Sequence, residues 1–492
     1  MGSSAISRDN KTEERRGRGK EVGQERSSVS IEVHSRPRPA KAEKNKKIDI
    51  AKYHSLLERD YVKRIGRVSQ VVGLTIESVG PDVKVGSTCL IRKTKRDEGT
   101  LSQVVGFREN KILLMPLGTM DGVSPGCIVE ALGKPLTVKV SDKLVGRVLD
   151  GLGQPMDGKG SIFDGEEWPT WHHSPDPLRR ARIRENLSLG VKAIDGLLTI
   201  GKGQRVGIFA GSGVGKSTLM GMIARNTAAE ITVIALVGER GREVREFIER
   251  DLGEEGLKRS VLVVATSDQP ALIRIKAAEV ATTIGEYFRK QGKDVILLMD
   301  SLTRYAMAQR EVGLAIGEPP VSRGYTPSVF ALMPQLLERA GTADRGSITG
   351  MYTVLVDGDD MNEPITDAAR GVLDGHIVLN RSIANRNIYP AIDVLASVSR
   401  VMPDIASPEH LELANGIKKS MAVYSNAEDL INIGAYVRGS NEGIDDAIQK
   451  HTEIQEFLTQ SVNEKFSTEQ VIIKMEKIFS PSTPPEASEG AQ

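Results

Sequence analysis

The chain has 492 residues, of which 39% are hydrophobic and 27% charged, and it carries a formal net charge of +1. This length predicts two to four domains, and the composition is typical of globular proteins that bury a large core. The longest apolar runs, such as VILLM at residues 295–299, fall far short of the roughly 18 residues that a membrane-spanning helix needs. The N-terminus is charged and has no apolar signal segment, so we expect a cytoplasmic protein.

Charge is distributed unevenly along the chain. Residues 1–47 contain 13 Lys and Arg against 7 Asp and Glu, a net charge of +6, which leaves −5 for the rest of the chain. Proteins that bind nucleic acids concentrate positive charge on the folded domain, so we expect no nucleic-acid partner. Cys89 and Cys127 are too few for a disulfide framework and are expected to be small core residues.

The first 61 residues divide into two segments. Residues 1–47 have many charges and few large apolar side chains, so they cannot bury enough surface to offset the entropy of ordering. We expect them to form a disordered basic tail. Residues 48–61 are predicted to form a short amphipathic helix that packs on its own protein or on a partner helix. Its apolar face has helical spacing and consists of Tyr53, Leu56, Leu57 and Tyr61.

Short strands separated by Gly and Asp turns fill residues 62–135. Strands at this spacing without helices between them predict a small β-barrel. Residues 136–200 are rich in Gly and Pro and are interpreted as a connector to the next domain. His172 and His173 form an adjacent pair there, but no Cys or third ligand lies near them in the sequence. A metal site is therefore not expected at this pair.

Apolar runs alternate with helical patterns over residues 201–407. This alternation predicts crossover units and an α/β core with a mostly parallel sheet covered on both faces. From residue 408 to residue 480 the pattern is helical only, and Pro and Gly are expected to keep residues 481–492 unfolded. The clearest helix spans 269–290, with apolar residues at helical spacing: Ile273, Ala277, Val280, Ala281, Ile284 and Phe288.

A glycine-rich stretch, AGSGVGKS, lies between the predicted strand RVGIF and a predicted helix. A phosphate-binding loop requires this placement, because the glycines let backbone N–H groups surround phosphate oxygens at the positive end of the helix. Lys216 is expected to reach the β- and γ-phosphates, and the Ser217 hydroxyl to bind Mg²⁺. The predicted nucleotide-binding residues of the loop are Ala210, Gly211, Ser212, Gly213, Val214, Gly215, Lys216, Ser217 and Thr218.

Two later strands end in acidic residues. Asp300 closes VILLMD and Glu239 closes ITVIALVG. Because the carboxyl ends of parallel strands share one ligand crevice, Asp300 is expected to orient Mg²⁺ through water, and Glu239 to activate the attacking water. The alternatives are a buried capping acid for Asp300 and a structural acid for Glu239. Arg240 is a candidate contact to the γ-phosphate, whereas Arg242 is expected to form a solvated pair with Glu246.

Four stretches carry a resemblance to a known family: GERGRE, DSLTRYAMAQREVGLAIGEPP, GYTPSVFALMPQLLERAG and YPAIDVLASVSR. Together they resemble the catalytic ATPases of rotary ATP synthases, and most closely the flagellar and injectisome type III protein-export ATPases. The resemblance covers roughly residues 49–480. It implies a β-barrel, a RecA-like nucleotide-binding core over residues 201–407 and a C-terminal helical domain.

The resemblance also assigns roles to residues. It makes Lys216 and Ser217 ligands of phosphate and Mg²⁺, and Glu239 the general base. It makes Asp300 a second acid on the metal side, with Arg240 and Arg304 as phosphate-side contacts. Arg400 is implied to be an arginine finger that reaches the nucleotide of a neighbouring subunit, which favours a homohexamer. In the family, an aromatic residue often packs on the adenine where this chain has Leu411, so base selectivity is expected to be loose.

The function implied is hydrolysis of ATP with Mg²⁺ at the base of a membrane export apparatus, with flagellar export favoured over injectisome export. Implied partners are a dimeric regulator at the N-terminal helix, a central stalk protein, export chaperones with cargo and the membrane export gate. Three alternatives remain. A rotary-synthase subunit is disfavoured by GSGVGKST and GERGREV, an RNA-translocating ring by the near-neutral body, and a non-catalytic scaffold by Glu239.

Overall fold

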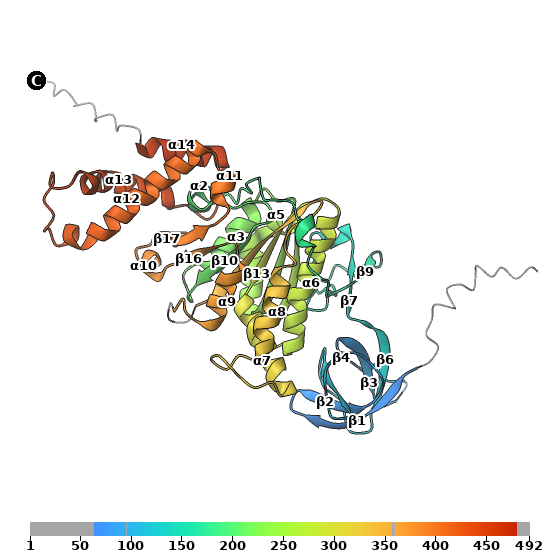
Figure 1. Cartoon of the computed structure of the whole chain (residues 1–492). Coiled ribbons are helices and arrows are strands. Elements are labelled where there is room, and N and C mark those ends of the chain that lie inside the picture. Colours follow the sequence, from blue (N-terminus) through green and yellow to red (C-terminus); the bar gives the residue numbers. More distant parts are fainter. Residues whose placement is uncertain (1–62, 95, 357, 359, 480–492) are drawn as a thin grey trace, which may run out of the picture. The chain divides into compact units, whose positions relative to one another are not determined.

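The structure is a computed structural model that describes residues 63–94, 96–356, 358 and 360–479 (Figure 1). The predicted basic tail at 1–47, the predicted amphipathic helix at 48–61 and the predicted C-terminal tail at 481–492 lie outside these residues. Among the helices of the described part of the chain, none is long and apolar enough to cross a membrane.

A closed β-barrel forms the first part of the described chain, blue and cyan in Figure 1. Its strands are β1 (Ile65–Val72), β2 (Thr75–Val79), β3 (Ser87–Arg92), β4 (Thr100–Arg108), β5 (Lys111–Pro116) and β6 (Ile128–Pro135), in the order β1-β2-β5-β4-β3-β6. Alternate residues, such as Val68 and Ile76, fill the interior together with Cys89 and Cys127, which are free thiols. The predicted barrel and the core position of both cysteines are confirmed.

The segment between the barrel and the phosphate-binding loop has more structure than the sequence predicts. It contains β7 (Thr137–Val140), η2 (Asp142–Leu144), β8 (Val148–Asp150), β9 (Glu166–Pro169), η3 (Pro177–Arg179) and α2 (Lys192–Leu197). Strand β7 pairs with β9, and β8 pairs in parallel with β12 at one end of the core sheet. Strand β8, which precedes the expected start of the core at residue 201, thus belongs to the core sheet. A three-residue strand followed by a Gly-rich turn carries no periodicity that could reveal it.

The central sheet has the strand order β17-β16-β10-β15-β13-β11-β12-β8. The pairings along this path are parallel except that β17 runs antiparallel to β16, and β14 pairs antiparallel with β15 off the path. The strands are β10 (Arg205–Ala210), β11 (Ile231–Glu239), β12 (Ser260–Thr266), β13 (Asp294–Asp300), β14 (Gly341–Thr342), β15 (Ser347–Leu355), β16 (Gly375–Leu379) and β17 (Ile392–Ser399). The middle strands are apolar on both sides because helices cover both faces. The predicted α/β core is confirmed.

Alternate residues of each strand face two separate hydrophobic clusters. Phe209 packs in a cluster with α6 to α9, whereas its neighbours Ile208 and Ala210 pack in a cluster with α2, α3 and the C-terminal helices. All apolar positions predicted for the 269–290 helix are buried along α6. The helices of the core are α3 (Lys216–Asn226), α4 (Gly241–Glu246), α5 (Gly253–Lys258), α6 (Ala271–Lys290), α7 (Leu302–Ile316), α8 (Pro327–Leu337), α9 (Pro364–Val372), α10 (Arg381–Asn385) and α11 (Met402–Ile405).

The helical segment that follows Glu239 is not a regular α-helix throughout. Helix α4 passes into a π-helical turn, η4 (Phe247–Leu252), and α5 begins directly after it at Gly253, which has a φ of 67°. The turn packs closely on α3, because a Cβ at Gly221 would lie 2.6 Å from the carbonyl oxygen of Asp251. Its apolar residues Phe247 and Leu252 are buried in the core, and Arg242 pairs with Glu246 at 2.5 Å as predicted.

The C-terminal region is helical, as predicted, and is red in Figure 1. It consists of α12 (Pro408–Asn432), α13 (Glu442–Leu458) and α14 (Thr468–Phe479). Side chains of Ser407 and Asn441 cap the first two helices by accepting hydrogen bonds from backbone N–H groups. Phe457, Val471 and Met475 pack on α2 near Gly196, in the same hydrophobic cluster as α3.

Candidate functional site

The loop between β10 and α3 has the geometry of a phosphate-binding loop. Gly213 and Gly215 adopt φ values of 79° and 90°, which L-residues with a side chain rarely take. Val214 is 1% exposed and anchors the loop in the core, while Ser212 and Gly213 remain exposed. Helix α3 begins at Lys216, so unpaired backbone N–H groups of its first turn face the loop. The loop is therefore suited to an anion such as a polyphosphate.

Lys216 lies between two carboxylates. Its Nζ is 2.5 Å from Asp300 Oδ1 and 3.6 Å from Glu239 Oε1. The Thr353 hydroxyl on β15 donates a second hydrogen bond of 2.7 Å to the same Asp300 oxygen. These residues meet because β10, β11, β13 and β15 are parallel and end at one edge of the sheet. The prediction that Glu239 and Asp300 share the crevice of the loop agrees with this geometry.

A β-bulge aims Glu239 at Lys216. The pairing of β11 with β12 shifts register between Val237 and Glu239, and such a bulge redirects the side chain that follows it. Gly238, inside the bulge, has a φ of 73° and leaves no room for a side chain, because a Cβ there would lie 2.9 Å from Arg304 Cβ. Arg304 on α7 thus packs directly against the turn that carries Glu239.

The electrostatics of the site follow from its burial. Burial and the negative charge of Asp300 raise the pKa of Glu239 to about 7, although Lys216 acts in the opposite direction. Burial lowers the pKa of Lys216, but the charges of Asp300 and Glu239 outweigh it and hold this pKa above its ordinary value. Lys216 therefore stays charged at neutral pH, and Glu239 is close to the midpoint of its titration, where a general base is most effective.

The side chains beside the loop can hold a divalent cation only if water and a bound phosphate supply further oxygen donors. No cluster of three or more His, Cys, Asp or Glu side chains suited to a metal occurs among the described residues. Asp300 accepts its hydrogen bonds from Lys216 and Thr353 through Oδ1, so Oδ2 is left for another partner. The half-buried Ser217 supplies a hydroxyl on the first turn of α3. Such a sparse donor set is typical of Mg²⁺ sites that are completed by water and substrate phosphates.

The structure separates the predicted arginines. Arg304 is half-buried beside Gly238, and its Nε is buried without a hydrogen-bond partner in the described residues. This guanidinium is close to the strand end that carries Glu239. Arg240 instead is 73% exposed and pairs with Glu243 at 3.2 Å. Its predicted contact with the γ-phosphate is therefore not supported by this conformation and stays a prediction.

Arg400 lies at the end of the sheet opposite the phosphate-binding loop, where the parallel strands begin. It follows the last residue of β17, and Ser399 is paired with Gly375, the first residue of β16. Strand β10 spans Arg205–Ala210, so at about 3.3 Å per residue the two edges are roughly 17–20 Å apart. Arg400 is exposed there, and its backbone N–H donates to the Asp374 carbonyl at 3.1 Å. Within one chain it cannot reach a phosphate held by Lys216.

A cavity of about 320 Å³ opens beside the phosphate-binding loop. Tyr389 provides its aromatic wall, 3.6 Å from where a Cβ on Gly215 would lie. The cavity is lined by Gly215, Thr218, Leu219, Met222, Tyr389, Pro390, Gln460, Ser461 and Val462. This volume and shape suit a planar, partly apolar group attached to a phosphate chain.

The expectation of loose base selectivity at Leu411 is not tested by this cavity and stays a prediction. Leu411 does not line it and packs instead at the edge of the hydrophobic cluster around α3. The aromatic side chain comes from Tyr389, directly before Pro390 in YPAIDVLASVSR. The sequence analysis assigns a role to Arg400 in that stretch and none to Tyr389. Gln460 had no local signal, because its link to Tyr389, a backbone hydrogen bond of 2.9 Å, joins residues far apart in the sequence.

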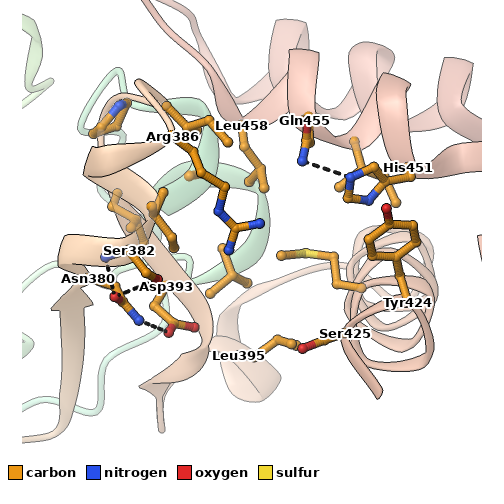
Figure 2. Close-up of a pocket in the computed structure, with 18 of the residues that line it drawn as sticks. Asn380, Ser382, Arg386, Asp393, Leu395, Tyr424, Ser425, His451, Gln455 and Leu458 are labelled. Atoms are coloured by element: carbon orange, nitrogen blue, oxygen red, sulfur yellow. Dashed lines mark hydrogen bonds between the residues drawn. The ribbon is translucent and has the colours of Figure 1, made fainter. Parts of the chain in front are cut away.

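A second cavity, of about 270 Å³, separates β17 and α10 from α12 and α13 (Figure 2). Tyr424 and His451 stack there with ring centroids 3.5 Å apart, and Arg386 pairs with Glu428 at 3.0 Å. None of the residues of the phosphate-binding loop lines it. Its polar contacts join the C-terminal helices to the core, and it is distinct from the site around Lys216.

Comparisons with known proteins agree with this architecture. Residues 68–133 match the model of the ATP synthase alpha/beta family, beta-barrel domain, and residues 190–399 match the nucleotide-binding domain of the same family. Residues 406–477 match the T3SS EscN ATPase C-terminal domain. Both the barrel and the helical region therefore have counterparts in known families.

Similar proteins cover most of the chain. A flagellum-specific ATP synthase of Bacillus subtilis is 57% identical over 84% of this chain and 94% of its own length. A type 3 secretion system ATPase of Xanthomonas euvesicatoria is 51% identical over 82% of this chain and 91% of its own length. The assembled ATPase EscN of enteropathogenic E. coli superimposes with a TM-score of 0.80 at 47% identity, over 84% of this chain and 99% of that one.

The raised pKa of Glu239 predicts a pH-dependent effect of Glu239→Gln on stability. The folded state binds the proton of Glu239 more tightly than the unfolded state does. The free energy of unfolding of the wild type therefore falls as pH rises from about 4.5 to about 7, because the buried carboxyl group becomes charged. Glutamine cannot ionise. We expect Glu239→Gln to be more stable than the wild type at pH 8, by about 1–3 kcal/mol, and similar to it near pH 5.

Urea-induced unfolding at both pH values measures this difference. Glu249→Gln is the matched control, because Glu249 is exposed and pairs with Arg245 on the surface. An equal effect of Glu239→Gln at pH 5 and pH 8 would show that burial does not raise the pKa of this carboxyl.

Proposed function

The chain belongs to the family of flagellum-specific ATP synthases and type 3 secretion system ATPases, and from this premise we propose how its site hydrolyses ATP and what it serves. Its function is that of a type III export ATPase. We infer flagellar export as the setting, supported by the identity of 57% to a flagellum-specific relative against 51% to a secretion-system relative. The observation that carries the mechanism is the position of Lys216 between Asp300 and Glu239.

The proposed reaction is in-line attack of water on the γ-phosphate of ATP. Glu239 accepts the proton of the attacking water, and a pKa near 7 suits this role at neutral pH. Lys216 and the loop N–H groups bind the phosphates. Mg²⁺, when bound, neutralises phosphate charge, and Ser217 and Asp300 are the residues suited to hold it, Asp300 through water. Tyr389 is proposed to stack on the adenine, in the cavity next to Gly215.

We propose that six copies form a ring in which Arg400 of one copy completes the site of the next. This explains why Arg400 lies exposed at the sheet edge opposite the loop. Support comes from the similar EscN chain, whose structure was determined as the assembled ATPase. Each chain contains both Glu239 and Arg400 and therefore serves as donor and acceptor. The match of residues 406–477 to the EscN C-terminal domain favours export over a rotary synthase.

The turn between α12 and α13 is the proposed contact for a central stalk protein. It exposes three apolar side chains, Leu430 at 49%, Ile433 at 75% and Val437 at 70%. An exposed apolar cluster of this kind marks an interaction surface. EscN, which is 46% identical to this chain, was also solved in complex with its central stalk EscO, and this supports such a partner.

Further partners follow from the family. We propose that a dimeric regulator binds the N-terminal segment 48–61, and that export chaperones deliver cargo to the ring. The membrane export gate would receive that cargo, which places the protein in the cytoplasm at the base of a membrane apparatus. No nucleic acid is proposed as a partner, because the chain outside residues 1–47 has a net charge of −5.

Arg400→Ala is expected to abolish most turnover and to leave nucleotide binding intact. An arginine finger contributes about 10³ to 10⁵ in rate, and it acts only on the transferring phosphate. Mixing Arg400→Ala with Glu239→Gln should restore part of the activity, because one kind of mixed interface has both groups intact. Steady-state phosphate release from the mixture is the measurement. A mixture no more active than its components would contradict a site shared between copies.

Tyr389→Ala is expected to raise KM for ATP and to change kcat much less. Loss of stacking on a base costs about 1–3 kcal/mol, or roughly 5- to 150-fold in affinity. Tyr389→Phe keeps the ring and should bind normally. Leu411→Ala, which removes a contact at the edge of the core, should lower the thermal stability and leave KM unchanged. The opposite pattern, with KM sensitive to Leu411 and not to Tyr389, would overturn the assignment.

Ile433→Asp is expected to weaken binding of the central stalk protein by at least about tenfold, because it places a charge in an apolar contact. The ATPase rate of the protein without the stalk should not change. Ile473→Asp on α14 is the matched control, since Ile473 is also apolar and 52% exposed. Titration calorimetry with the cognate stalk protein provides the affinities, and equal losses in both variants would exclude the α12–α13 turn as the contact.

A further inference from the structure

Two arginines from different elements come together at the sheet edge that carries the proposed finger. Arg370 lies on the last turn of α9, and Arg400 follows β17. The Arg400 Nη2 is 3.5 Å from the backbone carbonyl oxygen of Arg370. Burial lowers the pKa of the neighbouring His376, and the positive charges of Arg370 and Arg400 lower it further. The Arg400 guanidinium therefore lies against the backbone of Arg370, at the end of the sheet where β16 begins.

No acidic side chain of the described residues pairs with either arginine. Asp374 is an acid close to Arg400, but its carboxylate already accepts hydrogen bonds from Arg205. The donors are the backbone N–H and the Nε, each at 3.1 Å, and Nη2 at 3.2 Å. Its backbone carbonyl accepts the N–H of Arg400. The arginine pair thus keeps its positive charge, while the acid next to it is neutralised by a third arginine.

Arg370 is also incompletely hydrogen-bonded. Arg370 is half-buried, and its Nε is buried without a hydrogen-bond partner in the described part of the chain. A buried donor without a partner is unfavourable, because it has lost its hydrogen bonds to water and gained none in return. Ile365, Thr366 and Ala369 are buried and fix α9 to the core, so the helix cannot simply turn Arg370 away. The arrangement is unfavourable in the isolated chain and calls for an anion from outside it.

We propose that Arg370 acts with Arg400 as a second guanidinium that contacts the terminal phosphate of a nucleotide bound to a neighbouring copy of this chain. The inference rests on the proposed ring and extends it, because only Arg400 was expected to act across the interface. During phosphoryl transfer, negative charge is spread over three equatorial oxygens of the transferring group. Two planar guanidinium groups can offer paired N–H donors to more than one of these oxygens.

Arg370→Ala is the first variant to measure. We expect kcat to fall about 10²- to 10³-fold, the range for removal of one charge-stabilising donor, with nucleotide affinity changed less than about threefold. Thermal stability should stay the same or rise, because the substitution removes a buried Nε without a hydrogen-bond partner in the described residues. Arg370→Lys keeps the charge without the fork and should have intermediate activity. Lys258→Ala on the surface of α5 is the control and should match the wild type.

Mixed rings decide between action across the interface and action within one chain. Arg370→Ala mixed with Glu239→Gln should regain activity, because each Arg370→Ala copy supplies an intact Glu239 and each Glu239→Gln copy supplies both arginines. If Arg370 served only its own chain, every site in the mixture would contain a defect and no activity would return. The parallel mixture of Arg400→Ala with Glu239→Gln tests the ring itself, so failure there identifies failure of the proposed function.

The outcomes are distinct. Recovery in both mixtures supports the second guanidinium, whereas recovery with Arg400→Ala and not with Arg370→Ala overturns it and leaves the ring in place. Full activity of Arg370→Ala also overturns it. Where Arg370→Ala does not fold, Arg370→Lys and Arg370→Gln take its place in the mixtures. Trapping of ADP with aluminium fluoride, a mimic of the transferring phosphoryl group, should be lost in Arg370→Ala while binding of ADP alone is kept, and normal trapping would contradict the proposal.

Discussion

An ammonium group held between two carboxylates determines how the central site of this protein works. Lys216 lies 2.5 Å from Asp300 and 3.6 Å from Glu239, and both acids are almost buried. A triphosphate entering this site adds negative charge to a place that already contains two acids. Lys216 alone cannot balance that charge in a low-dielectric crevice. The site therefore depends on additional cations, and Mg²⁺ and arginines from outside the chain are the groups proposed to supply them.

The topology of the sheet is the reason we propose that those arginines come from another copy. Parallel strands bring the phosphate-binding loop, Glu239 and Asp300 to one edge, and the antiparallel strand β17 brings Arg400 to the opposite edge. Because β17 is antiparallel, a single chain binds nucleotide at one end of the sheet and presents guanidinium groups at the other end. In the proposed ring, the arginine side of one copy meets the nucleotide-binding side of the next, so that every site is complete. In this proposal, hydrolysis is coupled to assembly of the ring.

Much of this could be predicted from the sequence, because the signals were local. The spacing of Gly213, Gly215 and Lys216 between a strand and a helix identified the loop, and strand-end acids identified Glu239 and Asp300. Long-range features were not accessible in this way. Strand β8 is too short to show periodicity, and the π-helical turn at Phe247–Leu252 depends on close packing against Gly221. Tyr389 and Gln460 share a cavity only because the C-terminal helices fold back on the core, and Arg370 meets Arg400 only through the register of β16 with β17.

The central claim is that each site needs a second copy of the chain. The most direct test is the specific ATPase activity of the purified protein over a wide range of concentrations, with the oligomeric state determined in the same samples by mass photometry. Turnover per chain should fall in step with dissociation of the assembly and should be nearly absent in the monomer. A monomer that hydrolyses ATP at the full rate at every dilution would contradict the account.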